Sequence, residues 1–403
     1  WNRQKYKIHE YFSMMGVDDN AIGLTRKQLE ETATHADALM KMYEQDPDIV
    51  LKYTYPEYIQ KIHAINHHNL GEISDTEFIE RIEKLHESAD PMDYTDKGID
   101  KNVSMPIEML LAYAKTDYGE RGKDHIRNLY RSVISYAFHM PKMGLLGSLL
   151  GDYAVILDNY IEVPGSLTFE EMGMQSFAAF HPPTYVHSNM VAHISSCLAE
   201  NLIRRRPDLF VGICGCDSEA EVTAAAQRIA DFVYHAALCH DFGKLCIMDT
   251  IFIYGRKLLD HEFETIKYHP LIGYNMLKKH ESTAEYADIA LGHHIWYDGT
   301  RGYPDEFDIR SSLYKTVIDI VECADCMDAA TDTVGRSYTS GKTLEEFTAE
   351  VRAAAGTRYA PYIADLIEEE AVADDLSYLL SEGRGEIYRK TYMLLKSVQE
   401  KTE

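Results

Sequence analysis

The sequence predicts an all-α protein built from two parts, and three observations support this fold class. Apolar residues recur at the helical spacing of three and four positions along most of the chain, and no stretch shows the alternation of a half-buried strand. The length of 403 residues exceeds one ordinary hydrophobic core, so we expect two domains. The helical pattern is interrupted by Val163-Pro164-Gly165-Ser166. We therefore place the boundary between a first part, residues 1–165, and a second part, residues 166–403.

In the first part, apolar periodicity predicts helices over residues 26–43, 56–69, 75–86, 107–118, 123–139 and 144–162. Ser74 and Glu77 have the spacing of a capping box at the start of the third of these. Residues 89–104 are polar and contain Pro91, so we interpret them as a long connection.

The first part shows no group of acids, histidines or glycines whose spacing predicts a reactive site. The neighbours His67 and His68 point to different faces of a helix, and we interpret both as polar surface. Residues 1–165 are therefore predicted to be a helical regulatory region that binds a protein or a small ligand. The oligomeric state stays open, with a homodimer among the alternatives.

The second part has its own helix starts, and three pairs have the capping-box spacing: Thr168 with Glu171, Ser218 with Glu221, and Thr343 with Glu346. We expect helices over about 184–204, from 218 to about 240, and from about 309 onward. Two or three amphipathic helices after residue 343 are expected to pack on the same domain. His261 and His280 are predicted to be exposed helix residues.

The charge and the cysteines limit the class of protein. A formal net charge of −25 argues against a nucleic-acid polymer or an anionic membrane surface as the main partner. It leaves room for a small phosphorylated substrate, because bound cations reverse the local potential. The seven cysteines are odd in number and form no secreted framework, so we expect a cytoplasmic protein. We expect neither a membrane span nor a signal peptide, and because the chain begins with Trp1 it stays open whether a segment precedes it.

The chain is organised around residues 237–244, where His240 and Asp241 close an apolar helical run and Lys244 follows three residues later. An imidazole and a carboxylate on neighbouring positions are ligands for transition metals, and the two carboxylate oxygens can bridge two ions. The alternative for this pair alone is a buried ion pair at the end of a helix. Further ligand types decide between them: His187, His269, His293, His294 and Asp325. Asp328 follows Asp325 by one turn on the same helical face. A metal centre is therefore predicted.

These residues resemble the HD-GYP family of the HD phosphohydrolase superfamily over about residues 182–339. The resemblance rests on six motifs taken together: His187-Ser188; His240-Asp241-Phe242-Gly243-Lys244; Tyr268-His269-Pro270 with Gly273; His293-His294 with Asp298-Gly299; Gly302-Tyr303-Pro304; and Ala324-Asp325 with Asp328-Ala329, Arg336 and Tyr338. An HD phosphohydrolase of the general kind needs only the ligands His187, His240, Asp241 and Asp325. The additional histidines and the Gly-Tyr-Pro element favour the HD-GYP subfamily.

The resemblance implies hydrolysis of a cyclic dinucleotide, above all cyclic di-GMP, as part of bacterial second-messenger signalling. It implies that one ion is held by His187, His240, Asp241 and Asp325, and the other by Asp241, His269, His293 and His294. Two cations about 3.5–4 Å apart would generate a bridging hydroxide that attacks phosphorus. Asp241 and Lys244 are thus the expected catalytic residues, and substrate contacts are expected at Lys244, Arg301, Tyr303 and Arg336. For the two arginines and for Lys342, a solvated loop charge is the alternative.

Four departures from the family pattern affect the expected substrate more than the expected chemistry. Ile295 stands where the family has Glu, and Thr300-Arg301 makes the next loop one residue longer. The segment from Asp328 to Arg336 is two residues longer than in the family, and Ser337 and Thr339 stand where the family has Pro and a basic residue. Pro183 stands where some members have a Glu for a third metal, so we predict two divalent ions. Mixed imidazole and carboxylate ligands favour iron or manganese.

Three functions therefore remain open at this point. The first is cleavage of cyclic di-GMP or cyclic GMP-AMP. The second is a general HD phosphohydrolase activity on another nucleotide. The third is a non-catalytic nucleotide sensor that signals through the first part of the chain.

Overall fold

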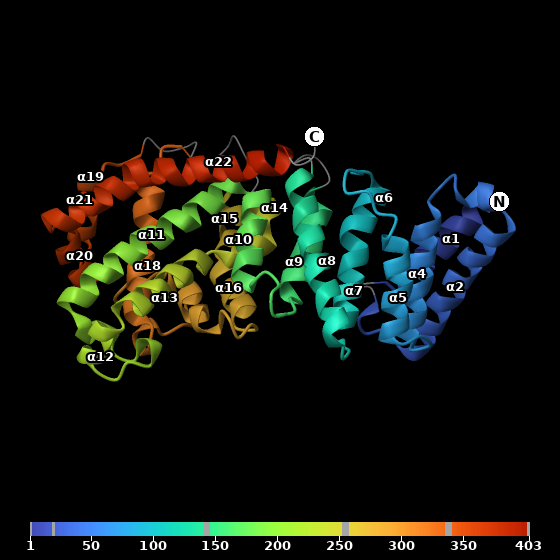
Figure 1. Cartoon of the computed structure of the whole chain (residues 1–403), viewed down its shortest axis with the longest axis horizontal. Helices are drawn as coiled ribbons and strands as arrows, with labels where there is room; N and C mark the ends of the chain where they lie inside the picture. Colours follow the sequence, from blue (N-terminus) through green and yellow to red (C-terminus); the bar gives the residue numbers. More distant parts are fainter. Residues whose placement is uncertain (1, 18–20, 141–145, 252–257, 335–340, 401–403) are drawn as a thin grey trace. The chain divides into compact units, whose positions relative to one another are not determined.

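The computed structural model of the protein describes residues 2–17, 21–140, 146–251, 258–334 and 341–400 (Figure 1). Helices dominate these residues, and their one pairing of β type is an isolated bridge between Ala355 and Tyr359. The predicted all-α class is therefore confirmed. Among the same residues, no helix is long and apolar enough to cross a membrane.

Contacts divide the chain into two compact units. The first comprises Trp1–Met143 and Asp158–Ser166, and the second comprises Gly144–Leu157 and Leu167–Glu403. From Leu167 onward all residues belong to the second unit, so this boundary lies one residue after the predicted one. Most of α9 (Leu146–Asp158) also belongs to the second unit, although it precedes the boundary. Within that unit the ring of Tyr153 on α9 packs edge-on against Phe180, with centroids 4.7 Å apart. The roles assigned to the two parts stay predictions.

The first unit is a set of helices: α1 (Asn2–Met14), α2 (Arg26–Gln45), α3 (Pro47–Val50), α4 (Pro56–Leu70), α5 (Asp75–His86), α6 (Asp96–Ile99), α7 (Met105–Tyr113) and α8 (Gly119–His139). A cluster of buried side chains from the first four of these includes Tyr6, Leu39, Val50 and Ile59. The side chain of Ser74 accepts the amide of Glu77 and caps α5, but the side chain of Glu77 pairs with Arg81, so only half of the predicted capping box forms.

The interpretation of residues 89–104 as a polar connection is wrong for its second half. Residues 96–99 form α6, and Asp100–Ser104 continue as a π-helical turn into α7. Asp100 and Lys101 are buried there, where Asp100 pairs with Lys61 and accepts a hydrogen bond from Tyr55, while Lys101 pairs with Glu57. These partners lie about forty residues earlier in the chain, so the local polarity gave no sign of burial.

The second unit surrounds the long helix α11 (Pro182–Arg205), which packs against α10 (Phe169–Phe180), α13 (Ala226–Cys239), α18 (Lys315–Thr331) and α22 (Arg384–Glu400). In Figure 1, α22 runs along α11. The remaining helices are α12 (Glu219–Ala224), α14 (Met248–Ile251), α15 (Asp260–Ile266), α16 (His269–Leu277), α17 (Ala287–Gly292), α19 (Leu344–Ala353), α20 (Pro361–Ile367) and α21 (Glu370–Tyr378). The capping boxes at Thr168 and Thr343 are present as predicted.

Two local predictions in the second unit need correction. The helix expected from residue 218 to about 240 is two helices, because α12 ends at Ala224 and α13 begins at Ala226. His280 is not an exposed helix residue: it follows α16, is 6% exposed and packs against Phe169 with ring centroids 4.0 Å apart. A buried aromatic from α10 provides this packing, which is more than a hundred residues away in sequence.

Candidate metal centre

Helix ends and helix faces of the second unit bring all seven predicted metal ligands together. His187 lies in the second turn of α11, and Asp325 lies on α18. His240 and Asp241 follow the last residue of α13, while His269 is the first residue of α16. His293 and His294 follow α17. All of these side chains are buried except that of His294, which is 21% exposed.

A close backbone contact brings His269 beside Asp241. The chain after Asp241 forms the 3-10 helix Phe242–Ile247, which packs directly on the first turn of α16. A Cβ atom at Gly243 would lie 1.9 Å from the carbonyl oxygen of His269 and 2.6 Å from the amide nitrogen of Gly273. Because backbone atoms cannot move aside as a side chain can, only glycine fits at position 243. This explains the glycine of the His-Asp-x-Gly-Lys segment.

The two oxygens of Asp241 face different pairs of imidazoles. Oδ2 lies 3.4 Å from Nε2 of His240 and 3.7 Å from Nε2 of His187. Oδ1 lies 3.2 Å from Nε2 of His269 and 3.9 Å from Nε2 of His293. This is the arrangement that a carboxylate bridging two cations requires.

Asp325 borders both groups of histidines. Its Oδ1 lies 3.0 Å from Nε2 of His187, and its Oδ2 lies 3.8 Å from Nδ1 of His294. His269 and His293 approach each other to 3.1 Å between their Nε2 atoms. Ligand atoms of His269, His293 and His294 lie within 4.8 Å of one another, and so do those of His187, His240 and Asp241. The structure thus brings the predicted ligands together in two adjoining groups.

Helix-end carbonyl groups orient three of the imidazoles. Nδ1 of His240 lies 2.6 Å from the carbonyl oxygen of Ala237, Nδ1 of His269 lies 2.7 Å from that of Ile266, and Nδ1 of His293 lies 2.7 Å from that of Ala290. These oxygens belong to the last turns of α13, α15 and α17, where helical carbonyls have no partner within the helix. Since a carbonyl only accepts, each Nδ1 carries the proton, and each Nε2 presents its lone pair to the centre.

Several buried atoms of the centre lack a hydrogen-bond partner. Among the described residues, these include Nε2 of His240 and Oδ1 of Asp241. Burying such groups unsatisfied costs free energy, and native proteins avoid it unless another ligand is bound. Imidazole nitrogens together with carboxylate oxygens suit divalent transition metals. The donor set therefore fits metal ions.

The protonation states also suit metal binding. Burial alone would raise the pKa of Asp241, but Lys244 and His240 outweigh it and hold the pKa well below its ordinary value. Burial lowers the pKa of His269, lowers that of His293 strongly and lowers that of His294 to about 3. Asp241 is therefore an anion, and these three imidazoles are neutral, as metal ligands must be.

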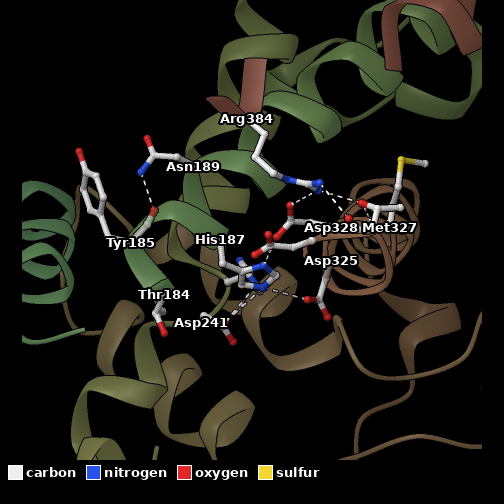
Figure 2. Close-up of polar contacts among 12 residues, drawn as sticks. Thr184, Tyr185, His187, Asn189, Asp241, Asp325, Met327, Asp328 and Arg384 are labelled. Carbon is white, nitrogen blue, oxygen red and sulfur yellow. Dashed lines mark hydrogen bonds and ion pairs between the residues drawn. The ribbon is translucent and has the colours of Figure 1, made fainter. Parts of the chain in front are cut away.

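His187 differs from the other histidines because two carboxylates surround it (Figure 2). Its Nδ1 lies 2.6 Å from Oδ2 of Asp328, whose Oδ1 accepts a hydrogen bond of 2.8 Å from Arg384 on α22. Burial would lower the pKa of His187, but hydrogen bonds to Asp325 and Asp328 raise it to about 9. A metal ion at Nε2 would therefore displace a proton from His187.

Sequence reasoning missed the roles of Asp328 and Arg384. Asp328 was placed correctly on the face of Asp325, but its contact with His187 lies 141 residues away in sequence. Arg384 is 8% exposed and also donates to Oγ1 of Thr331. No local motif marks it, because its partners belong to another helix.

The predicted substrate contacts have different surroundings. Lys244 pairs with Oδ2 of Asp241, and its side chain is 20% exposed. The ring of Tyr303 lies 4.7 Å from that of His294 between centroids. The guanidinium group of Arg301 lies over Trp296 at 5.0 Å from the ring centre. Arg336, Ser337, Tyr338 and Thr339 lie outside the described residues, and Lys342 pairs with Glu350.

The segment after the double histidine is fixed by the turn between α19 and α20. The amide groups of Tyr297 and Asp298 donate to the carbonyl oxygens of Arg358 and Thr357, at 2.9 and 3.0 Å. Ile295 is 5% exposed and so belongs to the core. The position where a Glu was expected therefore holds an apolar core residue that offers no polar contact.

Comparison with known proteins agrees with this geometry. Residues 184–330 match the family model described as HD domain. A cyclic di-GMP phosphodiesterase of Thermotoga maritima is 33% identical over 148 residues, which cover 36% of this chain and 39% of that protein. The cyclic di-GMP phosphodiesterase response regulator RpfG of Xanthomonas campestris is 31% identical over 150 residues, covering 37% of this chain and 38% of that protein. A 3'3'-cGAMP-specific phosphodiesterase 2 of Vibrio cholerae is 30% identical over 159 residues, covering 38% and 29%. The match thus spans about two fifths or less of these relatives.

Proposed function

Residues 184–330 of the second unit match the HD domain, and from this premise we propose that the protein is a metal-dependent phosphodiesterase of the HD-GYP type that hydrolyses a cyclic dinucleotide. The supporting observation is the position of Asp241, whose two oxygens face two separate pairs of imidazoles. A single mononuclear site would leave one of these oxygens buried without a cation.

Two divalent ions are proposed, held by the two predicted ligand sets that share Asp241. Iron and manganese are the candidate metals, because the sets mix imidazole with carboxylate. Such ions would activate a water molecule and neutralise charge on the phosphoryl group. Pro183 occupies the first turn of α11, where it offers no side-chain ligand for a third ion.

The residues around the centre have distinct proposed tasks. Asp241 holds the two ligand sets in register, and Asp328 fixes the ring of His187 through Nδ1. Lys244 reaches the centre from its partly exposed side, where its ammonium group can donate to a phosphoryl oxygen. The ring of Tyr303 forms a wall beside His294, against which a nucleotide can lie.

The proposed substrate is cyclic di-GMP, with cyclic GMP-AMP as the second candidate, because the relatives are named for one or the other. A net charge of −25 would repel either dianion unless cations reverse the potential locally. This proposal includes a regulatory role for the first unit and a role in bacterial signalling. It also includes a cytoplasmic location, with which the seven cysteines are consistent because they form no disulfide.

The test is turnover by the full chain loaded with Mn²⁺ or Fe²⁺ under anaerobic conditions. Cyclic di-GMP, cyclic GMP-AMP and a phosphate monoester are offered in parallel, and linear dinucleotide is the expected product. His240→Ala and Asp241→Ala should abolish turnover. His193→Ala is the matched control, because His193 lies on α11 but contacts Tyr234 outside the centre.

Two other outcomes would replace the proposal. Hydrolysis of the monoester without hydrolysis of either cyclic dinucleotide would indicate a general HD phosphohydrolase. Binding of a cyclic dinucleotide without turnover, and equally well after metal removal, would indicate a nucleotide sensor.

A further inference from the structure

A second group of metal-ligand side chains lies in the first unit, where α2 packs against α4. Asp37 comes from α2, and His63 and His67 come from consecutive turns of α4. Nε2 of His63 and Nε2 of His67 each lie 3.0 Å from the same atom, Oδ1 of Asp37. The spacing of residues along the chain did not show this group, because Asp37 belongs to a different helix from His63 and His67.

The position of Glu72 fixes the orientation of His67. Nδ1 of His67 lies within hydrogen-bond distance of Oε2 of Glu72, a residue just beyond the end of α4. A carboxylate accepts, so Nδ1 carries a proton, and Nε2 is the nitrogen that faces Asp37. A carboxylate behind the outer nitrogen is the usual support for a metal-binding imidazole.

The two Nε2 atoms of His63 and His67 and the carboxylate oxygen of Asp37 lie close together, and they repel one another in several protonation states. If His67 is neutral, the lone pair of Nε2 points at an oxygen of Asp37, which is repulsive unless a proton or cation lies between them. The rings of His63 and His67 have centroids 4.3 Å apart, so two imidazolium ions there would repel each other. Burial, followed by the charge of His67, lowers the pKa of His63. One cation between the three side chains removes both conflicts.

We propose that Asp37, His63 and His67 form a binding site for a divalent transition-metal ion of the zinc, cobalt or nickel class. Two imidazoles with one carboxylate favour these ions over magnesium or calcium. Ligand atoms bound to one ion at about 2.0–2.2 Å lie about 3–3.5 Å apart, which matches the observed spacing. The ion would connect α2 to α4 and so fix the helix pair that the first unit is built on.

A metal ion at this site can exchange with solvent, because its three ligand side chains are partly exposed. The side chains of His67 and His63 are 14% and 24% exposed, and that of Asp37 is 58% exposed. Water can therefore complete the coordination on the outer side. Arg81 lies close enough to His63 to lower its pKa, but it pairs with Glu77 at 2.6 Å. The site would respond to the available metal concentration, unlike the buried centre of the second unit.

The experiment counts zinc ions bound per full chain by elemental analysis after chelator treatment and dialysis against zinc. The double variant His63→Ala/His67→Ala should bind one ion fewer than the unchanged protein. His68→Ala is the matched control, because His68 lies on the same helix but pairs with Asp75 and stacks on Phe78. It should bind the same number of ions as the unchanged protein.

A second measurement separates a lost site from a lost fold. Asp37→Asn removes the charge but keeps the shape, and it should weaken zinc binding while the helical circular dichroism stays unchanged. Equal zinc counts in the unchanged protein and the double variant would overturn the proposal, and so would loss of the ion in His68→Ala. Because the count at the second unit is common to all variants, failure here is distinct from failure of the phosphodiesterase proposal.

Discussion

Raising the pH should destabilise the metal-free protein through His187. Its pKa rises from the ordinary value of 6.5 to about 9, because Asp325 and Asp328 outweigh the effect of burial. The folded chain thus binds this proton more tightly than the unfolded chain. The resulting stabilisation is complete below about pH 6.5 and is lost as the pH rises through about 9. At about 1.4 kcal/mol for each pKa unit, its size is about 3 kcal/mol.

Asp328→Asn tests this reasoning, because it keeps the shape of the side chain and removes the charge. The hydrogen bond between His187 and Asp328 also holds the pKa of Asp328 below its ordinary value, against the effect of burial. Both pKa shifts report this one interaction, so we count its free energy only once. Since two carboxylates hold the proton, we expect the variant to lose about half of the effect, about 1–2 kcal/mol. The variant should be less stable near pH 6, and its stability should fall less towards pH 9. The unchanged protein should show the steeper decline.

Urea denaturation of chelator-treated protein measures the free energy of unfolding at each pH. The sequence has two tryptophans, so a Trp1→Phe background leaves Trp296 as the fluorescent reporter of the second unit. His187→Gln should flatten the profile, and adding Asp328→Asn to it should change the pH dependence no further. Parallel profiles for the unchanged protein and Asp328→Asn from about pH 6 to about 9 would refute the argument.

Three further substitutions test the centre itself. Asp241→Asn should lower the metal content and reduce phosphodiesterase activity by more than about 100-fold, because both ligand sets lose their shared anion; elemental analysis and turnover measure this. Lys244→Met should retain the metal ions but lower kcat by about 100–1,000-fold, if its ammonium group stabilises the phosphoryl charge; an unchanged kcat would remove Lys244 from the mechanism. Gly243→Ala should lower the free energy of unfolding by about 1–3 kcal/mol, because its Cβ meets the backbone of His269, and a denaturation midpoint equal to that of the unchanged protein would contradict the packing argument.

The supporting contacts of His187 show where sequence reasoning ends. Asp325 and Asp328 could be placed on one helical face, because their spacing follows from the geometry of an isolated helix. That Asp328 lies between His187 and Arg384 depends on the packing of three helices distant in sequence. The resulting rise in the pKa of His187 was therefore beyond prediction from the sequence.

The cluster of Asp37, His63 and His67 in the first unit likewise depends on contacts between helices. The spacing of His63 and His67 was readable as two residues on one face of a helix. Asp37 belongs to another helix, and only the packing of α2 on α4 brings its carboxylate to that face. Burial of Lys101 beside Glu57 likewise depends on a partner from another helix.

The sequence by itself determined the helical class, the helix starts with capping residues and the set of side chains that meet around Asp241. Each of these depends on local periodicity, or on motifs in which residue type and spacing carry the chemistry. Only the tertiary structure decided which oxygen of Asp241 faces which histidines, which helix-end carbonyls orient the rings and which buried charges are paired. These features depend on contacts between segments far apart in the chain, whose geometry is set by the packing of the whole unit.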